Sequence, residues 1–203
     1  MFLSNESELL ALFAISDSIK EDSKSAIKTL NEMGVKTVMI TGDNQSSARH
    51  VASEVGIAEY SFNVLPHEKY AIVNDYKNKG YFVAMVGDGI NDSPALKSAH
   101  LGVAMGTGTD IAIDSSDVVI ASGSLNGVVN TIKLSKKTMR IVKENLFWAF
   151  FYNVIAIPVA GGVFSFIGLN LTPTLASACM CLSSLFVVTN ALRINKNKKQ
   201  KKS

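Results

Sequence analysis

The chain has 203 residues, a formal net charge of +3 and two cysteines. This length fits one domain of about 150 residues with a smaller attachment. Two cysteines cannot build a disulfide framework. The excess positive charge comes mainly from the C-terminal tail, with no sign of a nucleic-acid-binding fold, so we expect no nucleic-acid partner. The first residues lack the basic and apolar segments of a signal peptide.

The first two thirds of the sequence alternate between short apolar runs and amphipathic helical patterns. Five runs read as strands: Leu9 to Ile15, Val35 to Ile40, Tyr81 to Val86, Leu101 to Met105 and Val118 to Ile120. Helical patterns cover Asp22 to Met33, Gln45 to Val55, Pro66 to Lys79, a short segment from Ser93, and a long segment from Leu125. Strands that alternate with helices predict an α/β fold with a parallel sheet and right-handed crossovers.

The last third of the sequence is apolar. No Asp, Glu, Lys or Arg occurs from Asn145 to Leu192. Because a membrane helix needs about 20 mostly apolar residues, this stretch predicts two transmembrane helices, at about 146–166 and 173–192. Lysines and arginines flank the pair on both sides and are absent from its connector. The positive-inside rule therefore predicts a multi-pass membrane protein with both termini in the cytoplasm and with membrane lipids around the hairpin.

Two glycine-flanked acidic loops follow predicted strands. They are Thr41-Gly42-Asp43-Asn44 and Gly87-Asp88-Gly89-Ile90-Asn91-Asp92. In open α/β sheets, ligands bind at the carboxyl ends of the strands. The glycines Gly42, Gly87 and Gly89 would let the backbone approach a phosphate, and carboxylates suit Mg²⁺.

Each polar residue of these loops has an expected role. Thr41 would hold a phosphoryl oxygen at a helix start, with Asp43 beside it. Asp88 is the natural Mg²⁺ ligand, and Asn91 and Asp92 would complete or orient its shell. Lys69, on the preceding helix, would neutralise phosphate charge. The alternative is ordinary turn chemistry, with Asp43 as a helix cap and Lys69 as a solvated lysine.

Polar and soft side chains interrupt the apolar hairpin. Met180 and Ser184 are four residues apart and share one helix face. Together with Tyr152 and Asn153 they offer a thioether and neutral oxygens without a carboxylate, a set that favours Cu(I) over Mg²⁺ or Ca²⁺. Alternatively, the methionine packs and the serine hydrogen-bonds within its own helix. Cys179 and Cys181 point to nearly opposite faces and serve as a further thiolate ligand or as small filler.

Taken together, these motifs resemble the C-terminal part of a copper-exporting, heavy-metal P-type ATPase, over most of the chain from about Leu9. The match rests on the loop from Gly87 to Leu96, on Gly106-Thr107-Gly108-Thr109-Asp110, and on Asp117-Val118-Val119. Asn145, Tyr152-Asn153 and Pro158 in the first predicted span, and Met180, Ser183-Ser184 and Asn190 in the second, have spacings similar to the Cu(I) subclass. A zinc or cadmium pump would carry a lysine and an aspartate there.

The resemblance implies an incomplete Rossmann-like (haloacid-dehalogenase-like) phosphorylation domain at 1–124. A linking helix follows at 125–144, two transmembrane helices at 145–192 and a basic tail at 193–203. It also implies Mg²⁺ and ATP as cofactors, Cu(I) as the transported ion, and Tyr152, Asn153, Met180 and Ser184 along the copper exit path.

The family's phosphorylated aspartate, in an Asp-Lys-Thr-Gly-Thr motif, has no counterpart in these 203 residues. Its strand would lie between the strands that end at Thr41 and Asp88. Without that strand, the sheet either keeps a gap or closes by direct pairing of its neighbours.

Three interpretations follow from this absence. The chain is part of an ATP-driven Cu(I) pump, inactive alone and dependent on a separately encoded N-terminal portion. Alternatively, it is a non-catalytic membrane protein that binds copper or modulates a full-length pump. Thirdly, it is a membrane-anchored phosphatase of the same fold, against which the missing nucleophile argues.

Overall fold

The computed structural model describes residues 2–5, 8–12, 18–87, 90–106, 114–163 and 172–196. The chain divides into two compact units, Met1–Asn130 and Thr131–Ser203. Each unit is described by itself.

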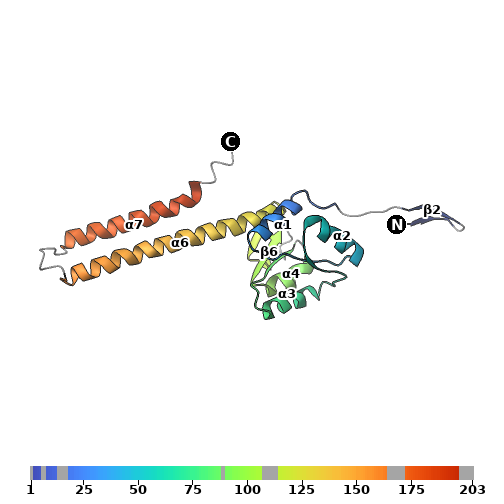
Figure 1. Cartoon of the computed structure of the whole chain (residues 1–203), viewed down its shortest axis with the longest axis horizontal. Coiled ribbons are helices and arrows are strands. Elements are labelled where there is room, and N and C mark those ends of the chain that lie inside the picture. Colours follow the sequence, from blue (N-terminus) through green and yellow to red (C-terminus); the bar gives the residue numbers. More distant parts are fainter. Residues whose placement is uncertain are drawn as a thin grey trace. The chain divides into compact units, whose positions relative to one another are not determined.

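The first unit contains three small sheets (Figure 1). β1 (Phe2–Ser4) and β2 (Leu9–Leu12) form an antiparallel hairpin. β3 (Val38–Ile40) pairs in parallel with β4 (Glu59–Ser61). β5 (Ala84–Gly87), β6 (Leu101–Met105) and β7 (Val118–Ile120) form a parallel three-stranded sheet in that order. The predicted α/β character with parallel strands is thereby confirmed.

Helices connect the strands of this unit. They are α1 (Ser23–Glu32), α2 (Gln45–Val55), α3 (Lys69–Asn78), the short turn η1 (Ile90–Asp92) and α4 (Ser93–Ser98). α2 begins where Asn44 accepts a hydrogen bond from the Ser47 amide (3.0 Å), and it ends at Gly56, whose φ of 83° is open to glycine. The alternative role of Asp43 as the cap is therefore wrong.

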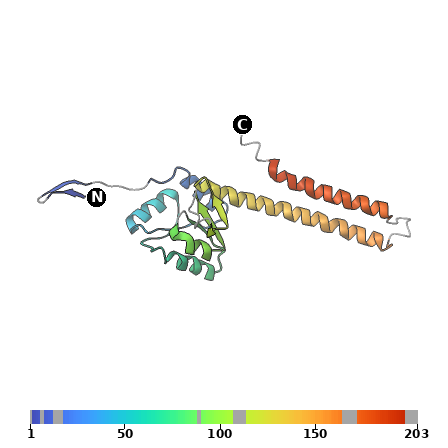
Figure 2. The ribbon, with the colours of Figure 1, turned by 180° about the vertical axis from the view of Figure 1, so that it is seen from behind.

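A small apolar core fixes α3 and α4 against the three-stranded sheet. Val73 of α3, Met85 of β5, and Ala95 and Leu96 of α4 form one buried cluster. Figures 1 and 2 both show α3 and α4 side by side. This cluster positions the two elements that carry Lys69 and the acidic loop.

Sequence patterns locate most elements of this unit. The limits of α2, β6 and β7 match the prediction, whereas β3, α3 and β5 begin three residues later than expected. Two strands, β1 and β4, were not predicted. Each has only three residues, too few for a period-two pattern to stand out.

The second unit is a helical hairpin. α6 (Leu125–Ala160) begins in the first unit and continues into the second, where α7 (Pro173–Lys196) lies beside it in both views (Figures 1 and 2). The Asn190 amide donates to Asn145 Oδ1 (2.9 Å), and Lys137 Nζ donates to the Arg193 carbonyl (3.1 Å). These contacts run in opposite directions along the two helices, so the pair is antiparallel.

The structure shows the two helices paired as a hairpin, but it does not support the prediction that they cross a membrane. Over the residues that the structure describes, neither helix combines the length and apolar character that a bilayer crossing needs. The predicted transmembrane hairpin is therefore not supported by the structure.

Candidate functional site

The loop after β3 is held by two hydrogen bonds to the hydroxyl group of a threonine within the loop. Thr41 Oγ1 donates to Asp43 Oδ2 (2.8 Å) and accepts from the Asp43 amide (3.1 Å). The side chains of Thr41 and Asp43, which were predicted together, are thus in direct contact at the carboxyl end of the strand. A Cβ added at Gly42 would have ordinary contact with the Val64 carbonyl at 3.6 Å, so this glycine is not enforced by crowding.

The turn after β4 braces this loop, and sequence reasoning missed it. The Thr41 amide donates to the Ser61 carbonyl (3.0 Å), the Val64 amide to the Thr41 carbonyl (3.1 Å), and the Asn63 amide to the Asp43 carbonyl (2.8 Å). Asn63 has a φ of 53°, which asparagine tolerates better than most residues. The asparagine after Tyr60-Ser61-Phe62 was the available sign of a turn.

The second loop has a buried ion pair at its base. Lys69 Nζ, at the start of α3, lies 2.7 Å from Asp92 Oδ1, and the two side chains are only 18% and 10% exposed. A Cβ added at Gly87 would lie 2.7 Å from Asp92 Oδ2, closer than real contacts allow. The crowding at Gly87 therefore comes from the Asp92 carboxylate of the same loop, and the expected approach of this backbone to a phosphate stays a prediction.

The remaining predicted residues of this loop are placed less fully. Asp88 and Gly89 lie outside the described residues. Asn91 is exposed. Ser93 Oγ is buried beside the loop and has no hydrogen-bond partner within the described part of the chain. The residues that are described bring hydroxyl, amide and carboxylate oxygens to this end of the strands, which are the donors that Mg²⁺ takes.

The two parallel sheets do not pair with each other over the residues that the structure describes. Among the described residues, β3 pairs only with β4, and β5 pairs only with β6 and not with β3. Of the two outcomes expected for a missing central strand, direct pairing of its neighbours is therefore wrong. The backbone groups on the outer edges of β3 and β5 have no strand partner among these residues.

A cluster of aromatic and charged side chains links the amino ends of the two sheets. Lys36, just before β3, lies over the ring of Tyr76 in α3 (5.5 Å) and over the ring of Tyr81, which comes just before β5 (5.3 Å). Lys36 Nζ is also 2.7 Å from Glu59 Oε1, and Tyr76 Oη donates to Glu59 Oε2 (2.9 Å). These hydrogen bonds lower the pKa of Glu59, and burial raises the pKa of Tyr76.

The candidate copper ligands divide between the two helices. Met180 and Ser184 line one open hollow on α7, together with Cys181, Leu185 and Val188, and Met180 is 74% exposed. Tyr152 of α6 instead contacts the ring of Phe186 (6.4 Å between centroids), and Asn153 is exposed. The described residues contain no group of three His, Cys, Asp or Glu side chains suited to a metal. Nothing is described of the Cys179 side chain.

Sequence comparison finds relatives of this chain among proteins named as copper-transporting ATPases. Residues 2–100 match the family model described as haloacid dehalogenase-like hydrolase. The Rhizobium meliloti protein called Copper-transporting ATPase 2 is 50% identical over 195 residues, which cover 96% of this chain and 24% of that protein. The human protein called Copper-transporting ATPase 2 is 49% identical over 191 residues, which cover 94% of this chain and 13% of that protein.

Structural comparison gives a consistent result. The crystal structure of a zinc-transporting PIB-type ATPase in the E2.Pi state matches with a TM-score of 0.77 and 36% identity, covering 88% of this chain and 28% of that one. The chain thus spans about a quarter of the length of these bacterial and structural relatives. It is a homologue of the copper-transporting P-type ATPases and carries a haloacid-dehalogenase-like α/β domain.

Proposed function

We propose that this chain forms the C-terminal part of an ATP-driven Cu(I) export pump. It contributes the loops that hold magnesium and phosphate, together with part of the copper path. The observation that carries the proposal is the buried Lys69–Asp92 pair seated on Gly87, in a chain that is half identical to copper-transporting ATPases over nearly its whole length. Such a pair fixes an acidic loop at the ligand-binding end of a parallel sheet.

The residues of the site have separate tasks in this proposal. The Thr41 hydroxyl, oriented by Asp43, hydrogen-bonds a phosphoryl oxygen. Lys69 neutralises charge at the base of the second loop and keeps Asp92 in place, so that Asp92 acts as a positioning residue. Mg²⁺, with Asp88 as its carboxylate ligand and Asn91 nearby, would supply the positive charge that stabilises phosphoryl transfer.

The nucleophile comes from polypeptide outside these 203 residues. They contain no Asp-Lys-Thr-Gly-Thr motif, and the described edges of β3 and β5 are free of each other. A parallel strand ending in aspartate would satisfy both edges at the usual spacing of about 4.8 Å. The chain then forms no phosphoenzyme alone and works beside the polypeptide segment that carries the nucleophile and binds ATP.

The helical hairpin carries the copper path in this proposal. Met180 and Ser184 already share one hollow, and Tyr152 and Asn153 face the path once the other helices of the pump surround the pair. Exposed apolar side chains cover both helices, among them Phe150, Val154 and Leu185, and such a surface suits lipid or partner helices. A plasma-membrane location with cytoplasmic termini belongs to the same proposal.

Copper rather than zinc is the proposed ion. The stretch from Asn145 to Leu192 contains no lysine or aspartate, whereas its soft and neutral donors suit Cu(I). The higher identity to proteins named for copper than to the zinc-transporting structure supports this choice. Silver, another soft monovalent ion, would bind similarly.

The test is functional complementation between two chains. The full chain is co-expressed with the Rhizobium meliloti protein cut just before the region that matches. We expect copper-stimulated ATP hydrolysis and vesicle uptake of Cu(I) only when both parts are present. Met180→Ala should abolish copper stimulation, whereas the control variant Leu182→Ala, at an exposed position of α7 that does not line the hollow of Met180, should retain it. Equal activity without this chain would refute the proposal.

A second candidate function is copper binding without transport, favoured by the hollow that Met180, Cys181 and Ser184 share. A Cu(I) titration against a competing chelator tests it on the chain alone. Binding that is lost in both Met180→Ala and Tyr152→Phe would support it, and absence of binding would remove it.

A further inference from the structure

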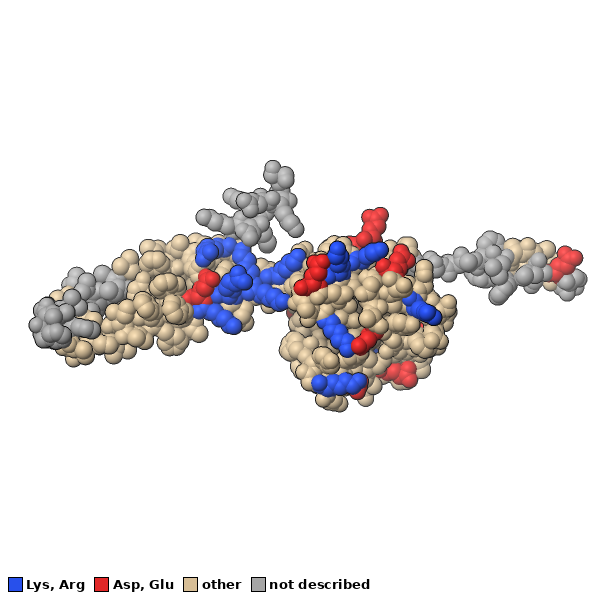
Figure 3. All heavy atoms as spheres, in the orientation of Figure 1, with Lys and Arg blue, Asp and Glu red and all other residues tan. Residues whose placement is uncertain are grey.

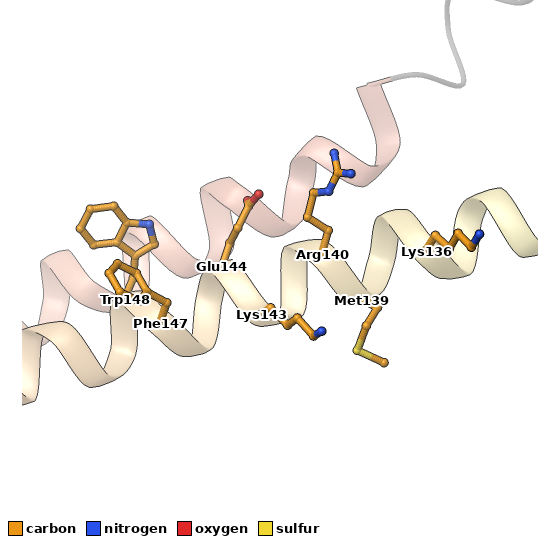
Figure 4. Close-up of a pocket in the computed structure, with 7 residues that line it drawn as sticks. All are labelled: Lys136, Met139, Arg140, Lys143, Glu144, Phe147 and Trp148. Atoms are coloured by element: carbon orange, nitrogen blue, oxygen red, sulfur yellow. The ribbon is translucent and has the colours of Figure 1, made fainter. Parts of the chain in front are cut away.

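A groove of about 570 Å³ runs along one face of α6 in the second unit (Figure 4). All of its lining residues come from this helix: Lys136, Met139, Arg140, Lys143, Glu144, Phe147 and Trp148. Their spacing of three or four residues places them on consecutive turns of one face. The order along the helix is basic first and aromatic second.

The positive charges of the groove are available to a ligand. Within the described part of the chain, Lys136, Arg140 and Lys143 make no ion pair. The single acidic member, Glu144, is engaged by α7: Arg193 lies 3.6 Å from it, and the Asn190 amide donates to it (3.2 Å). The groove therefore presents three cations on neighbouring turns, and Figure 3 shows Lys and Arg side chains gathered on this part of the hairpin.

An aromatic cluster borders these cations. Phe147, Trp148 and Phe151 contact one another with ring centroids 5.5 to 5.9 Å apart. Trp148 is nevertheless 47% exposed. Beyond the cluster, exposed side chains such as Phe150, Val154 and Ile157 continue the apolar surface along the helix. Aromatic rings between a basic and an apolar surface are typical of the headgroup level of a membrane.

We propose that this groove binds the phosphate headgroup of an anionic phospholipid, with Lys136, Arg140 and Lys143 on the phosphate and Phe147 and Trp148 at the start of the acyl chains. The graded order from charge to aromatic to apolar matches a single lipid molecule, whereas a nucleic acid or an acidic peptide would leave the exposed apolar surface uncovered. The proposal rests on the hairpin meeting a membrane, one part of the proposed function, and needs neither ATP nor copper.

Trp148 is the only tryptophan in the chain, so its fluorescence reports on this groove. The full chain, in a neutral detergent, is titrated with phosphatidylglycerol, phosphatidylcholine or inorganic phosphate. We expect a saturable change in emission with phosphatidylglycerol alone. Lys136→Gln/Arg140→Gln/Lys143→Gln should weaken that binding roughly 100-fold, at about 1 kcal/mol for each charge. Glutamine preserves helix propensity, and circular dichroism verifies the fold.

A charge-matched control separates the groove from general attraction. Lys198→Gln/Lys199→Gln/Lys201→Gln removes the same charge from the tail and should leave the affinity within a few fold. The proposal is overturned if phosphatidylcholine or free phosphate binds as well as phosphatidylglycerol, if an acidic peptide or an oligonucleotide gives the same response, or if the tail variant loses as much affinity as the groove variant. Copper-stimulated ATP hydrolysis by the assembled pump is measured separately, so failure of one proposal is distinguishable from failure of the other.

Discussion

Replacing Lys69 by methionine should remove the counter-charge of a buried carboxylate. Asp92 is 7% exposed, and Lys69 Nζ is the only cation that forms a salt bridge with it in the described part of the chain, at 2.7 Å. Breaking one partner of such a pair typically lowers the free energy of unfolding by 3–5 kcal/mol. Because the Lys69 side chain retains 18% exposure, we expect a loss near the lower limit, about 3 kcal/mol.

The chain itself offers a matched control. Lys79 Nζ lies 2.6 Å from Asp75 Oδ2, yet both side chains are more than half exposed. Surface pairs of this kind contribute little. Lys79→Met should therefore leave stability nearly unchanged, although its pair is as short as that of Lys69.

The free energy of unfolding of both variants is measured by urea unfolding of the full chain in detergent, followed by pulse proteolysis of the first unit. The double variant Lys69→Met/Asp92→Asn should recover much of the loss, because the amide has no charge to desolvate. Equal destabilisation by Lys69→Met and Lys79→Met, or no recovery in the double variant, would refute burial as the reason for the effect.

Three further predictions concern the same unit. Gly87→Ala should lower the free energy of unfolding by about 1–3 kcal/mol, because the new Cβ would displace the Asp92 carboxylate; unchanged urea unfolding would contradict the crowding. Asn44→Ala should lower the free energy of unfolding by about 1 kcal/mol and increase amide exchange in the first turn of α2. The control Asn78→Ala, at the last residue of α3, should not affect that turn. The hydrogen bond from Ser124 lowers the pKa of Asp22, so its stabilising contribution is complete above the unfolded pKa of about 4 and is lost as pH falls through the lower native value. Asp22→Asn should therefore weaken the dependence of the free energy of unfolding on pH across that range, and an unchanged pH dependence would count against this hydrogen bond.

The sequence predicts the parallel α/β domain because its strands and helices are locally coded. Gln45 to Val55 has both a cap and a glycine stop, and the continuous apolar run from Leu101 to Met105 admits only a buried strand. Strands such as Glu59–Ser61 are fixed by pairing with a distant segment and carry too few residues for a local pattern.

The candidate site divides in the same way. Thr41 and Asp43 are neighbours in sequence, and their contact follows from the turn. The pairing of Lys69 with Asp92 joins residues 23 positions apart, and it depends on α3 packing against α4 through Val73 and Leu96. Sequence placed Lys69 near phosphate charge, but only the packing identifies Asp92 as its partner.

The hairpin illustrates a different limit. Absence of charge from Asn145 to Leu192 predicted two transmembrane helices in a hairpin, and α6 and α7 do pair through Asn145 and Asn190. The antiparallel pairing was predictable because the connector is short. Crossing of a membrane was not supported over the described residues. Apolar composition alone does not decide whether lipid or another protein covers an exposed helix.

Acid-stable phosphoenzyme formation is the measurement that tests the proposed pump function most directly. The full chain is incubated with radiolabelled ATP and Mg²⁺, alone and together with the N-terminal portion of the Rhizobium meliloti relative. We expect no label with the chain alone, and label on the N-terminal portion only when this chain is present with Lys69 intact. Label on this chain by itself would contradict a nucleophile supplied from outside residues 1–203, and label on the partner without this chain would contradict its part in the phosphate site.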